Sequence, residues 1–172
     1  MANPALTDIA KLQALRDPLL SFKWVAESLP TISGIHLEPS FLESIDLPFN
    51  NISIADSWHG GSGFTYYPGT HDISSFSCTF YEDNHATTTK WLIAWKALVK
   101  DMDTGFYNLP SVFKKNINVI MLDSKNNSVL KAEMTGLWPA ETGNFALNYS
   151  DSGRIIITQT FSCDGQVLTP LM

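Results

Sequence analysis

The run His59-Gly60-Gly61-Ser62-Gly63 comes closer to a catalytic motif than any other segment of the sequence. In lipase-like hydrolases, a His-Gly-Gly stretch helps to build an oxyanion hole, which acts with a serine on a Gly-x-Ser-x-Gly turn. The sequence contains no such pentapeptide, because Phe64 stands where the last glycine would be. We therefore interpret the run as part of a glycine-rich loop, whose glycines permit unusual backbone dihedrals.

The histidines do not have the spacing of a metal site. Zinc sites are usually recognised from paired ligands, such as two histidines four residues apart on a helix or a Cys-x-x-Cys pair. No phosphate-binding glycine loop, dinucleotide motif or Cys-His nucleophile is present either. We therefore expect no catalytic residue, no metal and no cofactor, and we assign no ligand role to His36, His59, His71 and His85.

The two cysteines, Cys78 and Cys163, both lie in stretches that have the character of strands. The first 20 residues carry Asp8, Lys11, Arg16 and Asp17 and so lack the apolar core of a signal peptide. We therefore expect synthesis in the cytoplasm, where thiols stay reduced, and two free cysteines.

Four aromatic residues crowd the segment from Asn50 to Thr70, which is also rich in Gly, Ser and Asn. We interpret this segment as a long loop, and long loops are often functional. Its aromatic side chains would either bind a protein partner or pack on their own domain. The sequence leaves both roles open for Trp58, Phe64, Tyr66 and Tyr67.

Most of the sequence alternates between apolar and polar residues, which is typical of half-buried β-strands. The polar turn Ser124-Lys125-Asn126-Asn127 joins two such stretches and predicts a hairpin. We expect a turn region over Gly136 to Gly143, and a second hairpin after it. Strands are predicted over 41–49, 71–82, 117–123, 128–138, 145–149 and 155–161.

One segment, from His85 to Lys100, has helical periodicity. Its apolar residues fall at the i, i+3, i+4, i+7 and i+8 positions of an amphipathic helix. Asp83 or Asn84 can cap the first turn. We expect Trp91, Trp95 and Leu98 to pack inward, and a short helix over 6–15 in an N-terminal arm.

Length and charge favour one soluble domain. A chain of 172 residues with 44% hydrophobic and 16% charged residues has enough apolar material for one core. The net charge of −6 argues against a surface that binds phosphate backbones. No segment approaches the length of a membrane span.

Three stretches resemble the tail tube proteins of contractile-tailed bacteriophages. Thr79 to His85 leads into the helix with its two tryptophans, as in that family's passage from strand to helix. Leu37 to Phe49 is similar to its early strand. Gly136, Leu137, Trp138 and Pro139 form a turn that resembles its C-terminal signature, and we expect this turn to make a core or inter-subunit contact. The resemblance covers roughly residues 20 to 165.

The resemblance implies a small β-sandwich or barrel of antiparallel strands with one flanking helix, in a domain over 21–172 that follows an arm over 1–20. It implies a structural virion protein that is not an enzyme, assembled in the host cytoplasm into stacked hexameric rings of the tail. The implied partners are further copies, the tail sheath, the tape-measure protein and the baseplate. DNA would pass through the lumen without specific binding. In this role the loop from Asn50 to Thr70 is the candidate contact between rings.

Other roles fit the same residues. Asp103 to Lys115 departs from the family pattern, which leaves open whether the chain is the tube subunit or the related baseplate tube initiator. The inner tube of a secretion system shares the fold. A monomeric β-sandwich that binds carbohydrate or protein through the aromatic loop is the hypothesis outside this group.

Overall fold

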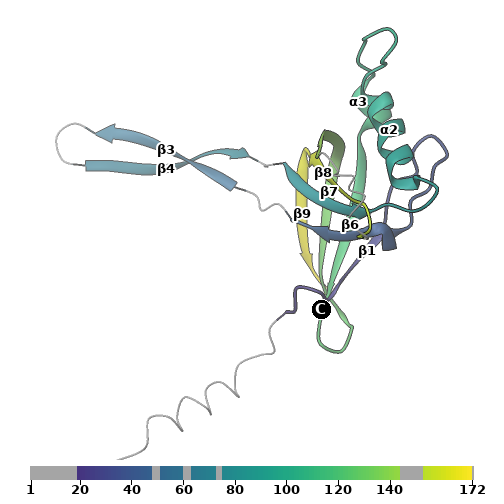
Figure 1. Ribbon diagram of the computed structural model, residues 1–172. Coiled ribbons are helices and arrows are strands. Elements are labelled where there is room, and N and C mark those ends of the chain that lie inside the picture. The colour runs from purple at the N-terminus through teal and green to yellow at the C-terminus, as the bar shows by residue number, and fades with distance from the viewer. Residues whose placement is uncertain (1–18, 48–50, 60–62, 73–74, 144–152, 172) are drawn as a thin grey trace, which may run out of the picture.

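The computed structural model describes residues 19–47, 51–59, 63–72, 75–143 and 153–171. Strands dominate these ranges, as predicted, and one long helix lies against them (Figure 1). The elements are β1 (Trp24–Ser28), the 3₁₀ turn η1 (Pro39–Phe41), β2 (Leu42–Ile45), β3 (Asn51–His59), β4 (Gly63–Asp72), β5 (Phe76–Tyr81), α2 (Thr87–Val99), α3 (Pro110–Phe113), β6 (Lys115–Leu122), β7 (Ser128–Thr142), β8 (Ile156–Ser162) and β9 (Gly165–Pro170).

The main sheet bends around its longest strand, β7. Its strand order is β1-β6-β7-β8-β5-β2, all neighbours are antiparallel, and β9 pairs with β7 as well. The first part of β7 pairs with β6 and β9, whereas its last residues, from Trp138 onward, pair with β8. Strand β7 therefore joins two half-sheets that enclose the core. This is the mainly antiparallel sandwich or barrel that was expected.

The bend in β7 lies at Gly136, in the segment predicted to be a turn. Gly136 has φ +67°, and the β6–β7 register shifts beside it. A residue in this left-handed region interrupts the pleat, as in a β-bulge, but does not end the strand. The prediction of a turn over Gly136 to Gly143 was therefore wrong, because the strand continues to Thr142. The strand predicted over 128–138 therefore ends four residues too early.

The amphipathic helix is confirmed as α2, and its tryptophans face the core. Trp91 and Trp95 are fully buried, and their rings meet edge to face with centroids 4.9 Å apart. Trp91 Nε1 donates to the carbonyl of Pro30 at 2.9 Å, and Trp95 Nε1 donates to that of Phe113 at 2.7 Å. Both indoles thus bury their area without leaving an N–H unpaired.

Two carboxylates hold the start of α2. Asp83 Oδ1 accepts from the backbone N–H of Thr87 at 2.8 Å. Glu82 accepts from the N–H groups of Thr88 at 3.0 Å and Thr89 at 2.9 Å. Helix N-termini favour such acceptors because their first N–H groups have no partner within the helix. Of the two predicted caps, Asp83 makes the contact.

The region predicted as a loop over Asn50 to Thr70 is instead a β-hairpin. Its strands β3 and β4 pair with each other and form a separate two-stranded sheet. His71 and Asp72, which were assigned to the next strand, belong to β4. The sequence patterns also missed β1 and β9. The predicted helix over 6–15 and strand over 145–149 lie outside the described residues.

Both cysteines are free and buried. Burial raises the pKa of the Cys78 thiol far above its usual range, and it also raises the pKa of Cys163. A thiol with a raised pKa holds little of the thiolate that reacts. These side chains therefore act as core packing residues.

Candidate assembly interface

The hairpin of β3 and β4 leaves the barrel and extends to one side of it (Figure 1). Three of its large apolar side chains are exposed: Ile52, Ile54 and Tyr67, with 63%, 71% and 50% of their surface accessible. In the register of the hairpin, Ile54 lies opposite Pro68 and Tyr67 lies opposite Ala55. A two-stranded hairpin is marginally stable alone in water. Exposed apolar side chains on such an element are typical of a contact surface.

The hairpin brings together the four aromatic residues singled out from the sequence. Trp58 lies opposite Phe64 in the register, and Tyr66 and Tyr67 lie opposite Asp56 and Ala55. All four therefore lie on one projecting element. Their role as a contact between rings stays a prediction. The run that resembled an oxyanion motif joins the two strands, and residues 60–62 of it lie outside the described residues.

The second set of predicted residues, Gly136 to Pro139, lies within β7. Leu137 is fully buried, and the Trp138 ring packs edge-on against Phe113 with centroids 6.4 Å apart. Pro139 pairs in register with Phe161. Leu137 thus belongs to the core and Trp138 is half-buried, while the expected role of this segment stays a prediction.

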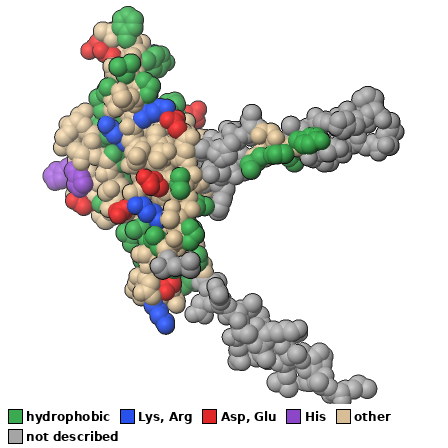
Figure 2. Space-filling view, turned by 180° about the vertical axis from the view of Figure 1, so that it is seen from behind, with side chains coloured by type: hydrophobic (Ala, Val, Ile, Leu, Met, Phe, Trp, Pro, Cys, Tyr) green, Lys and Arg blue, Asp and Glu red, His purple; other side chains and the backbone are tan. Residues whose placement is uncertain are grey.

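Sequence reasoning did not find the most exposed apolar surface of the described residues, which lies between α2 and α3. We call residues 100–112 the knob. Its large side chains point to solvent, with 82% of Met102, 76% of Phe106 and 72% of Leu109 exposed. Figure 2 shows apolar side chains and acids together at this end of the molecule. The signal in the sequence was a group of three large apolar or aromatic residues, Phe106, Tyr107 and Leu109, between a glycine and a proline.

Hydrogen bonds fix the shape of the knob. The Asp101 carboxylate accepts from the N–H groups of Asp103 at 2.9 Å and Thr104 at 3.2 Å, and these donors hold the pKa of Asp101 below its usual range. The Asp101 N–H donates to the carbonyl of Phe106 at 3.0 Å. Asn108 Nδ2 ties the loop to the carbonyl of Leu98 at 3.0 Å. The exposed side chains are thus carried on a loop with a defined backbone.

A groove of about 490 Å³ opens between β1 and β2, the two end strands of the sheet order, which do not pair with each other. We call it the seam groove. Lys23 and Asp46 are the charged residues that line it. Its apolar lining includes Leu19, Leu20, Trp24, Leu47, Val119 and Met121.

No group of three or more His, Cys, Asp or Glu side chains within the described residues is arranged to hold a metal ion. None of the helices among them is long and apolar enough to cross a bilayer.

Comparison with solved structures finds similar folds in chains of contractile injection systems. The chain superposes on the tube-terminating cap of the anti-feeding prophage with a TM-score of 0.69 at 10% identity, over 91% of this chain and 94% of that one. It superposes on the sheath/tube terminator of an extracellular contractile injection system, PVC, with a TM-score of 0.67 at 9% identity, over 90% and 99%. A chain of the PVC sheath-tube complex gives 0.62 at 10% identity, over 94% and 97%.

The sequence matches no family profile and no curated protein sequence. At about 10% identity, the structural likeness establishes the fold. The chain therefore has the fold of tube and terminator chains of contractile injection systems. The likeness spans nearly the whole of each chain, so the fold is shared as a unit.

Proposed function

We propose that this chain is a structural subunit of the inner tube of a phage-tail-like contractile machine, in which hexameric rings of the chain stack around a channel. The observation that carries the proposal is the hairpin of β3 and β4, which stands clear of the barrel and exposes Ile52, Ile54 and Tyr67. A projecting, marginally stable hairpin with an apolar surface is best explained by a neighbouring copy that covers it. The shared fold supports the same role.

In this role the chain is not an enzyme and binds no cofactor. Its partners are further copies, the sheath, the tape-measure protein and the baseplate, and it acts in the tail of the assembled particle. DNA passes through the lumen without specific binding. The net charge of −6 supports passage over binding, because the wall then repels phosphates on balance.

A second candidate is the terminal ring that ends such a tube. The observation in its favour is that the cap and terminator chains superpose with TM-scores of 0.69 and 0.67, above the 0.62 of the sheath-tube chain. A baseplate tube initiator, a secretion-system inner tube and a monomeric binding module are compatible with the same fold. A tube subunit polymerises into tubes when pure, whereas a terminator stops at rings.

Electron microscopy of the purified chain tests the proposal. We expect the wild type to form rings and, for the tube role, tubes. The double variant Ile54→Ser, Tyr67→Ser should keep its melting temperature and form rings that no longer stack, because it loses apolar area only on the hairpin. Ile93→Ser is the matched control, since Ile93 is 62% exposed on α2 and away from the hairpin. A wild type that stays monomeric at high concentration would contradict the proposal.

A further inference from the structure

We infer that the knob of one copy seats in the seam groove of the next copy around a ring. The inference rests on the proposed ring-forming function and deepens it by naming the two surfaces that meet.

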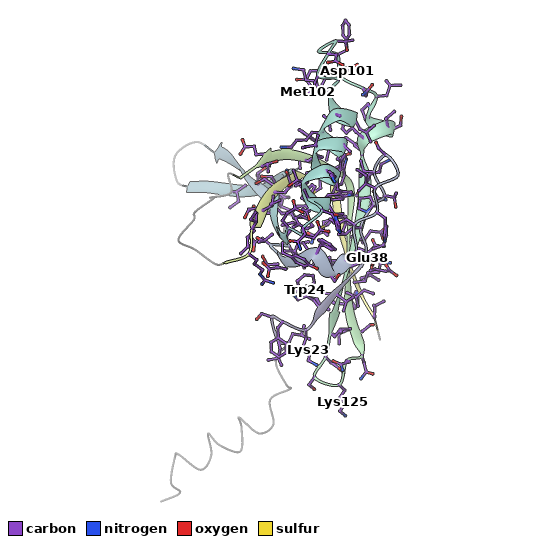
Figure 3. All side chains as sticks on the ribbon, turned by 45° about the vertical axis from the view of Figure 1, so that its right-hand side comes forward. Lys23, Trp24, Glu38, Asp101, Met102 and Lys125 are labelled. Atoms are coloured by element: carbon purple, nitrogen blue, oxygen red, sulfur yellow. The ribbon has the colours of Figure 1, made fainter. Side chains whose placement is uncertain are left out.

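The two surfaces lie at opposite ends of the molecule. Figure 3 places Asp101 and Met102 of the knob at one end of the drawn residues and Lys23 and Lys125 toward the other, with Trp24 between them and nearer to Lys23. Figure 1 agrees, because the connection between α2 and α3 and the turn between β6 and β7 lie at opposite ends. A projection at one end and a receptor at the other join copies head to tail. Such a heterologous contact gives a ring when its rotation closes.

The surfaces match in size and chemistry. The knob offers large, flexible or planar apolar side chains, of which Met102, Phe106 and Leu109 are more than two-thirds exposed. The seam groove has a volume of about 490 Å³ and an apolar lining. Sites of this size take ligands much larger than one side chain, so the groove has room for more than one knob residue.

The knob is built in advance of the contact. Asp101 and Asn108 hold its backbone through the hydrogen bonds described above, and Gly105 provides the left-handed residue, with φ +74°, that the tight loop needs. A preformed loop loses little conformational entropy on binding. An apolar loop that served only its own domain would instead turn these side chains inward.

Charge favours the head-to-tail orientation. The knob carries Asp101 and Asp103 together with Lys100, whereas the groove end carries Lys23 in the lining and Lys125 on the neighbouring turn. If two knobs met, the acids of one copy would lie against the same acids of the other, and the repulsion between like charges is unfavourable. Asp46 in the groove and Asp123 in the turn reduce the contrast. The carboxylate of Asp123 is held within its own turn by Lys125 N–H, Asn127 N–H and Asn127 Nδ2.

The proposed contact between knob and seam groove runs in a different direction from the hairpin. The hairpin leaves the barrel across the line that joins the two ends (Figure 1). A stack of rings needs one contact around the ring and a second along the axis. If the hairpin joins rings, as proposed above, the knob and the seam groove supply the contact around the ring.

Three variants of the full chain test the inference. The knob variant is Phe106→Ser with Leu109→Ser, and the groove variant is Leu20→Glu with Leu47→Glu. Ile93→Ser is the control for loss of an exposed apolar side chain outside both surfaces. Melting temperatures establish that each variant is folded. We expect the knob and groove variants each to need at least about tenfold more protein to form rings, while the control behaves as wild type.

Mixing the two defective variants gives the sharpest readout. The groove variant keeps an intact knob and the knob variant keeps an intact groove, so a 1:1 mixture has one working contact per pair. We expect mass photometry to find a heterodimer of twice the 19.1 kDa chain mass, with no closed rings. Each variant alone should remain monomeric at the same concentration.

The outcomes separate this inference from the proposed function. A folded knob variant that forms rings as readily as wild type would overturn the inference and leave the tube role standing. Association of the groove variant with itself at the concentration of the mixture, or no heterodimer in the mixture, would overturn it too. Open chains of wild type that depend on the knob but never close would support the contact and contradict the tube.

Discussion

At the scale of single residues, buried aromatic side chains connect the helix to the sheet. The Trp95 ring lies 5.4 Å from that of Phe161 and 4.9 Å from that of Trp91, measured between centroids. Phe80 extends the same cluster to β5. The helix is thus fixed to the half-sheet that contains β8 and β5 through a few large rings, so each ring carries a large share of the packing energy.

Replacing Trp95 with alanine should lower the free energy of unfolding by about 3–5 kcal/mol, because it empties a fully buried site and leaves the Phe113 carbonyl without its donor. Chemical denaturation measures the loss. Ile93→Ala on the exposed face of α2 should stay within about 0.5 kcal/mol of wild type. Equal stability of wild type and Trp95→Ala would show that the helix is placed wrongly.

A comparison of Gly136 with Gly34 separates the steric cost of an added side chain from the cost of a left-handed backbone. A Cβ on Gly136 would come within 2.3–2.9 Å of the Asp164 side chain, whereas a Cβ on Gly34, with φ +81°, would meet nothing within 4 Å. Gly34→Ala should therefore lower the free energy of unfolding only by the cost of a left-handed backbone for alanine, about 1–2 kcal/mol. Gly136→Ala should lower the free energy of unfolding by more than that, because the Asp164 side chain must also move. Its carboxylate lies 2.6 Å from Lys114 Nζ, and this ion pair would be disturbed. Urea denaturation of both variants tests the difference, and equal losses would argue against the steric contact.

At the scale of elements, the start of α2 depends on an ionised carboxylate. The Thr87 N–H, with further donors from the same turn, lowers the pKa of Asp83 below its ordinary value. A group whose pKa is depressed in the folded state adds stability above its unfolded pKa, and this stability is lost as the pH falls through the folded pKa.

Stability should therefore fall on acidification below about pH 4, the usual range of aspartate, through loss of this cap. Asp83→Asn keeps a capping side chain without the titration, so its stability should depend less on pH in that range. Denaturation at neutral pH and at about pH 3 gives the comparison. Parallel pH profiles for the two proteins would exclude Asp83 as a contributor.

Periodicity predicted the elements whose faces differ clearly and missed those whose faces do not. Helix α2 and the β6–β7 pair were predicted because one face of each is apolar. Strand β1 has one fully buried residue, Ala26, and β9 has one, Gln166, so neither gives an apolar alternation. The hairpin resembles a loop in sequence because its two strands pair only with each other. The knob was missed as a site because exposure cannot be read from residue type.

At the scale of the whole molecule, the barrel, the hairpin and the knob are three parts with different roles. The barrel buries the core, and the other two expose apolar side chains at separate places (Figures 1 and 2). Assembly and folding should therefore be separable by mutation. The division into an arm over 1–20 and a domain over 21–172 stays a prediction.

A chain that begins at Leu19 tests that division while keeping the groove residues Leu19 and Leu20. We expect it to unfold in one cooperative transition within a few degrees of the full chain, because every buried core residue lies beyond position 25. Calorimetry measures this. Loss of the transition would show that the first 18 residues belong to the domain.

The pairing order also sets when the fold can form during synthesis. Strand β1 cannot pair with β6 until Met121, the partner of Trp24, has been made. Strand β5 cannot pair with β8 until Phe161, the partner of Phe76, has been made. Ribosomes add about 5–20 residues per second, so β1 and the β8-facing edge of β5 remain unpaired for seconds while the later strands are made. Neither half-sheet is complete on a partly made chain. In the proposed ring, a copy should therefore join only after its release from the ribosome. A truncated product would lack the complete barrel and should not join the ring.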